Sequence, residues 1–104
     1  MIEAPIYHRE WTGADGLPET STIGATLLDN GGLKLNGQDI GHSVEVTWGD
    51  PDLEYWMTVR ASDLRHTLVA VLRDGFNRSG PLTWASLAAL LEAEGIDTDR
   101  GSWT

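Results

Sequence analysis

One segment decides the fold: Leu53-Glu54-Tyr55-Trp56-Met57-Thr58-Val59-Arg60-Ala61-Ser62-Asp63-Leu64. Its first half alternates with the period of two that is typical of a half-buried strand, and one face carries Leu53, Tyr55, Met57 and Val59. At Ser62, a favourable N-cap, the pattern changes to helical spacing, with apolar residues at Leu64, Leu68, Val71 and Leu72. We therefore predict a strand that runs directly into a helix, with this apolar stripe packed on the Tyr55 face of the sheet.

Working toward the N-terminus, a hairpin precedes this strand. Residues 23–27 and 33–35 alternate in hydrophobicity, and Asp29-Asn30-Gly31-Gly32 joins them. Asn-Gly readily adopts the positive φ angles of a tight turn. Asn36-Gly37-Gln38-Asp39 predicts a further turn, and residues 6–11 are compatible with a first, edge strand after Pro5.

Working toward the C-terminus, Asp74-Gly75 predicts the end of the first helix, and Thr83 is the N-cap of a second. The apolar stripe of this second helix consists of Trp84, Leu87, Ala88, Leu90 and Leu91. Gly95 stands where a left-handed C′ residue belongs, and Ile96 can fold back onto Leu91.

These elements predict an α+β fold: an antiparallel sheet of three to four strands with two C-terminal helices packed on one face. We expect a single domain over residues 1–104, made of an N-terminal arm and loop (1–22), the sheet (23–60), a helical layer (61–96) and a tail (97–104).

The segment from Ile40 to Trp48 fits two structures. Val44, Val46 and Trp48 alternate as in a strand, whereas Ile40, Val44 and Trp48 lie four apart as in a helix. Periodicity does not separate the two in so short a run.

Composition excludes several classes of function. The chain has no cysteine, which excludes disulfides and thiolate chemistry. No secretory signal precedes the first strand and no long apolar run is present, so we expect a cytoplasmic protein that does not enter a membrane.

Catalytic signatures are also missing, because no Gly-x-Ser-x-Gly or phosphate-binding motif occurs and His8, His42 and His66 lack metal-ligand spacing. We expect no enzyme, no metal and no cofactor.

The charge pattern is strongly acidic. Sixteen Asp and Glu face seven Lys and Arg, a net charge of −9, and no basic residue lies between Lys34 and Arg60. Such a surface repels phosphate groups, so we expect no direct nucleic-acid binding. It suits a basic protein partner, and the five tryptophans exceed what so small a core holds.

Two runs carry a family resemblance: Leu33-Lys34-Leu35-Asn36-Gly37-Gln38-Asp39-Ile40-Gly41, and Gly49-Asp50 followed by Asp52-Leu53-Glu54-Tyr55-Trp56-Met57-Thr58-Val59. Over residues 23–104 the chain resembles a group of small acidic bacterial proteins with a Gly-Gln-Asp-Leu-Gly turn and a Tyr-Glu-Tyr-Trp-like strand. The resemblance implies a short helix at residues 42–48, although β-branched Val44, Val46 and Thr47 oppose it. The group is similar in size and acidity to immunity proteins of bacterial toxin systems.

From charge, aromatics and resemblance, we predict a non-catalytic binding protein, an immunity- or antitoxin-like inhibitor that covers a basic face of a cytotoxic partner. The residues predicted to bind that partner are Glu45, Asp50, Asp52, Glu54 and Trp56. Two alternatives stay open at this point: a structural or regulatory subunit of an oligomer, and a small enzyme without a recognisable motif.

Overall fold

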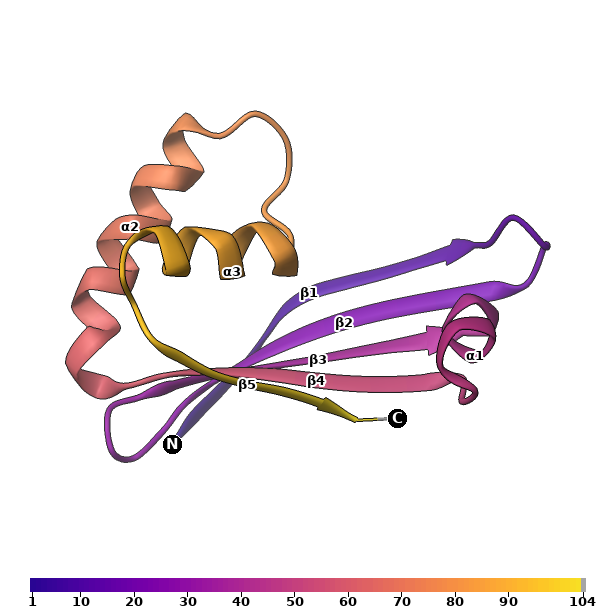
Figure 1. Ribbon diagram of the computed structural model, residues 1–104, viewed down its shortest axis with the longest axis horizontal. Helices are drawn as coiled ribbons and strands as arrows, with labels where there is room; N and C mark the ends of the chain where they lie inside the picture. Colours follow the sequence, from indigo (N-terminus) through magenta and orange to yellow (C-terminus); the bar gives the residue numbers. More distant parts are fainter. Residues whose placement is uncertain (104) are drawn as a thin grey trace.

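A computed structural model describes residues 1–103 of the chain. Its strands are β1 (Ile2–Thr12), β2 (Pro18–Leu27), β3 (Leu33–Gly41), β4 (Asp52–Val59) and β5 (Thr98–Trp103). They form one antiparallel sheet in the order β1-β2-β3-β4-β5 (Figure 1). The helices are α1 (His42–Trp48), the 3-10 turn η1 (Ala61–Asp63), α2 (Leu64–Asn77) and α3 (Trp84–Ala93).

The α+β class is confirmed, but the sheet has five strands rather than three to four. The predicted N-terminal arm is in fact β1 with the start of β2, and the predicted tail contains β5. Both added strands lie at sheet edges, and every side chain of β1 is exposed. The edge strand expected at residues 6–11 is confirmed within β1. A strand without a buried face carries no hydrophobic alternation, so the pattern gives neither the full length of β1 nor the presence of β5.

The turn predicted at residues 36–39 is wrong, because these residues continue β3 in register with β4. Gly37 lies opposite Tyr55, and the tyrosine ring occupies the space where a side chain of Gly37 would stand. Glycine is required here for the close approach of an aromatic ring, not for a turn.

Residues 42–48 form helix α1 despite their β-branched side chains. The buried carboxylate of Glu19 in β2 accepts hydrogen bonds from the backbone N–H and the hydroxyl of Ser43, at 2.9 Å each. Val44 is buried, and Gly49 ends the helix in the left-handed conformation. A tertiary cap and one apolar anchor thus outweigh the weak helix propensity of the segment.

The hydrophobic core lies between α3 and the Tyr55 face of the sheet, as the strand pattern predicted (Figure 1). Its buried members are Leu35, Met57, Val59, Leu91 and Ile96, and Leu33, Trp84 and Leu87 are among the half-buried residues packed around them. The rings of Tyr55 and Trp84 meet edge to face, with centroids 4.7 Å apart.

Helix α2 differs from the prediction at both ends and on its buried face. It starts at Leu64 without a side-chain cap from Ser62, and it continues to Asn77 past Asp74-Gly75. The small residues Thr67 and Ala70 are its buried ones, whereas Leu68 and Leu72 are 59% and 51% exposed. Thr67 can be buried because its hydroxyl donates to the carbonyl of Asp63 at 2.8 Å. Leu64 and Val71 of the predicted stripe are half-buried, so the stripe faces outward only at Leu68 and Leu72.

Helix α3 matches the prediction closely. Thr83 caps it in a reciprocal capping box with Ser86. At its end the N–H of Ile96 donates to the carbonyl of Leu91 at 2.9 Å, and Gly95 has a φ of 71°. These are the contacts of a Schellman motif, and they bring Ile96 into the core beside Leu91.

We expect Gly95→Ala to lower the free energy of unfolding by roughly 1 kcal/mol, because alanine is strained in the left-handed conformation. No atom lies within 4 Å of the added Cβ, so this cost is conformational and not steric. Urea unfolding of the variant beside the wild type measures it. A more stable variant would contradict the left-handed assignment of residue 95.

Candidate binding face

The sheet face turned away from α2 and α3, here called the polar face, carries three of the five predicted binding residues. Asp52, Glu54 and Trp56 alternate along β4 with the core residues and so point to this side. Their direct neighbours on β3 are Ile40, Gln38 and Asn36. Within residues 1–103, neither α2 nor α3 covers this side of the sheet (Figure 1).

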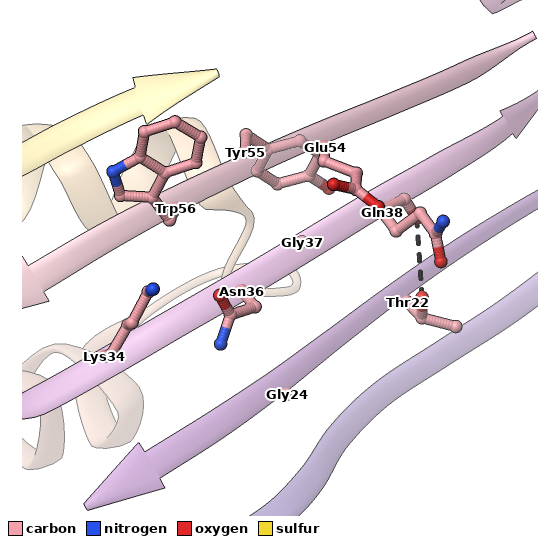
Figure 2. Close-up of a pocket in the computed structure, with 9 residues that line it drawn as sticks. All are labelled: Thr22, Gly24, Lys34, Asn36, Gly37, Gln38, Glu54, Tyr55 and Trp56. Atoms are coloured by element: carbon pink, nitrogen blue, oxygen red, sulfur yellow. Dashed lines mark hydrogen bonds between the residues drawn. The ribbon is translucent and has the colours of Figure 1, made fainter. Parts of the chain in front are cut away.

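A shallow open groove runs across the polar face (Figure 2). Side chains from three strands border it: Thr22, Lys34, Asn36, Gln38, Glu54 and Trp56. A second depression continues it toward β1 and shares Gly24 and Asn36 with the first. Gly24 contributes no side chain at the centre, and this leaves the middle of the face hollow.

Trp56 stands at one end of the groove. Its indole lies over Gly101 of β5, where it fills the space that a side chain would take. The ring is therefore half-buried against the last strand. The N-terminal strand β1 does not cover the indole of Trp56, because β1 forms the opposite edge of the sheet.

Asp50, Asp52 and Glu54 form a continuous acidic group beside Trp56. The carboxylate of Asp50 accepts the backbone N–H of Asp52 at 2.9 Å, and the carboxylate of Asp52 accepts the amide of Gln38 at 3.0 Å. Glu54 is exposed next to them. The carboxylates of Asp50 and Asp52 are thus held in position by these bonds, and the exposed carboxylate of Glu54 is available to a partner.

Glu45 does not belong to this group. It lies on α1, 3.8 Å from His42 Nδ1, and His42 Nε2 lies 3.6 Å from Asp15 in the β1–β2 loop. Glu45 therefore faces that loop at the end of the sheet, and the structure does not bring it to the groove.

The sequence analysis missed several residues of the polar face. Trp103 lies opposite Glu54 and is 69% exposed, and it gives the face a second tryptophan. By strand register the face also carries the acidic residues Glu3, Glu10 and Asp99, with Lys34 and His8 as its basic groups. The alternation of Lys34, Asn36 and Gln38 with Leu33 and Leu35 is a signal that could have placed Lys34 on this face.

A polar cluster on the other face of the sheet is structural. Asp39 Oδ1 accepts the hydroxyl of Ser21 at 2.7 Å and that of Tyr55 at 2.9 Å. Burial, and after it the hydrogen bond to Asp39, raise the pKa of Tyr55 to about 12, so the phenol is a hydrogen-bond donor at neutral pH. No histidine joins these bonds as a base for Ser21. The cluster fixes the Tyr55 ring over Gly37.

Two features are absent from residues 1–103. No three His, Asp or Glu side chains gather closely enough to hold a metal ion. None of the helices has the length and apolarity needed to cross a bilayer.

Comparisons with protein-family models, with curated proteins and with solved structures find no significant match to this chain. The candidate face is therefore interpreted from its own geometry and charge.

Proposed function

We propose that this protein is a non-catalytic binding protein that uses the polar face of its sheet to cover a basic face of a protein partner. The observation that carries the proposal is the open groove in which Glu54 and Trp56 lie side by side, with Asp50 and Asp52 adjoining. A tryptophan beside carboxylates on an uncovered sheet is suited to a partner that offers cationic side chains.

Charge on this face supports the same class of partner. Five carboxylates, from Glu3, Glu10, Asp52, Glu54 and Asp99, are set against one lysine, Lys34, and a histidine. Charges at the rim of an interface mainly accelerate encounter and fix register, while a buried aromatic supplies most of the affinity. We assign the first role to the carboxylates and the second to Trp56.

The specific form that we propose is an immunity- or antitoxin-like inhibitor whose partner is a cytotoxic protein with a basic active-site or substrate-binding face. Support comes from the small size, the net charge of −9 and the resemblance to small acidic bacterial proteins. Covering a basic face requires a broad complementary surface and no reactive group, and the open polar face fits that requirement.

The test is a pair of tryptophan variants. The immobilised chain captures its partner from native lysate, mass spectrometry identifies the protein, and binding kinetics are then measured on the purified pair. Trp56→Ala should weaken binding by about 2 kcal/mol. Trp48→Ala, which removes an exposed tryptophan of α1 away from the groove, should leave affinity unchanged. Thermal melts confirm that both variants are folded, with a modest loss for the half-buried Trp56.

Charge-reversal variants distinguish the carboxylates that speed association from the tryptophan that anchors the complex. Replacing Asp52 and Glu54 by lysine should slow association and flatten its salt dependence, whereas Glu45→Lys should change association less. A captured partner that is not basic, or equal losses in the Trp56 and Trp48 variants, would refute the proposed face.

A further inference from the structure

Helix α2 turns four of its large apolar side chains outward, while Leu64 and Val71 are half-buried. Leu68, Val69, Leu72 and Phe76, here called the α2 stripe, are 59%, 53%, 51% and 89% exposed. Its fully buried side chains are the small Thr67 and Ala70. Large aliphatic and aromatic side chains are normally the ones a helix buries, and contiguous exposed apolar surface of this kind marks an interaction site.

The accessible surface of the whole chain is larger than that of a compact monomer of the same mass. A compact monomer of 11.4 kDa is expected to expose about 5,800 Å². This chain exposes 6959 Å², and α2 rises from the end of the sheet instead of lying across it (Figure 1). The surplus of roughly 1,200 Å² is shared by α2, by the wholly exposed β1 and by the polar face. It is large enough to include the roughly 800 Å² per partner that a stable interface of standard size buries.

Gly75 adds an independent observation. It lies inside α2, where glycine costs roughly 1 kcal/mol relative to alanine. Its φ is not positive, and an added Cβ would meet nothing within 4 Å. Nothing in this chain therefore requires glycine at position 75. Two turns earlier, on the same flank of the stripe, lies Leu68.

We propose that the α2 stripe is covered by α2 of a second copy of this chain, in an antiparallel two-fold dimer centred near Leu72. In that arrangement the two Leu72 side chains meet at the axis, and Leu68 of each copy faces Gly75 of the other. Glycine then makes room for the leucine and allows the two backbones to approach closely. A two-fold axis buries the stripe of both copies with the same contacts.

Charge distinguishes this surface from the polar face. Four of the seven basic residues lie on α2 or directly beside it: Arg60, Arg65, Arg73 and Arg78. Three of them are paired with carboxylates of this chain, Arg60 with Asp63 and Asp97, Arg73 with Glu94 and Arg78 with Asp74. The charges around the stripe are therefore largely balanced, and α2 of a second copy meets little local repulsion there.

The two interfaces should respond to salt in opposite directions. Two copies of charge −9 repel each other at long range, so screening should strengthen the dimer. Binding of a basic partner to the polar face should weaken under the same change. The dimer does not depend on the proposed function, because it uses a different surface.

Sedimentation velocity of the full chain at about 100 μM, in low salt and in about 0.5 M NaCl, tests the proposal. The wild type should sediment as a dimer, more completely in high salt. Leu72→Arg should weaken dimerisation at least about 100-fold, because it brings two like charges together at the axis. Phe76→Lys, at the most exposed position of the stripe, is the second variant. Circular dichroism confirms that each is folded.

Val46→Arg is the matched control, since Val46 is 73% exposed on α1. It should remain dimeric. The proposal is overturned by a wild type that is monomeric in both salts. It is equally overturned by folded Leu72→Arg and Phe76→Lys variants that still dimerise, or by a Val46→Arg variant that dissociates as they do.

Discussion

Leu91→Ala should lower the free energy of unfolding by about 2–5 kcal/mol. Leu91 is 1% exposed and joins α3 to the sheet through Met57, Val59 and Ile96, which belong to the same core. Truncation removes apolar contact area and leaves a cavity between two rigid layers. The buried core is small for a chain of this length, so the loss is a large share of the total stability.

Leu17→Ala is the control for this substitution. Leu17 lies in the β1–β2 loop and is 45% exposed, so its truncation should cost less than about 0.5 kcal/mol. Urea unfolding of both variants compares the same leucine-to-alanine change at a buried and at an exposed position. Equal losses would mean that the contact between α3 and the sheet does not form the core.

Gly37→Ala should cost about 3 kcal/mol, the upper end of the usual range for overpacking. The added methyl group overlaps the ring of Tyr55. The Tyr55 ring cannot easily move away, because its hydroxyl donates a hydrogen bond to Asp39 and the ring packs edge to face with Trp84. On propensity alone, alanine in place of glycine would stabilise a strand slightly, so the sign of the effect is diagnostic.

A double-mutant cycle isolates the steric cause. In the background of Tyr55→Leu, which removes the ring, Gly37→Ala should cost much less than in the wild type. The coupling free energy is measured by urea unfolding of the four proteins. Strictly additive effects would show that the ring and the glycine do not share this space.

The elements that the sequence predicted well have local determinants. Helix α3 is bounded by Thr83 and Gly95, and the stripe between them is the one that packs. The predicted face of β4 was likewise right, since a period of two assigns Tyr55 and Trp56 to opposite sides without further information.

The elements that were left open or assigned incompletely depend on distant contacts. Helix α1 is capped by Glu19, 24 residues away along the chain, and no local pattern encodes that bond. Helix α2 was assigned a face that is only partly buried, because periodicity assumes that all of its large side chains are covered within the same chain. The groove was not foreseen, because it exists only when Gly24, Asn36 and Trp56 are brought together by three strands in register.

The outer edge of the sheet has a consequence for aggregation. An unpaired edge strand of eleven residues is a template for another strand to add to, and β1 is such an edge. Pro5 lacks an N–H, and the register shift between Pro5 and Tyr7 bulges the strand at that point. No added strand can bond along the whole of β1, and Arg9 and Glu10 place charges farther along it. The chain thus leaves its longest edge open while limiting uncontrolled polymerisation through it.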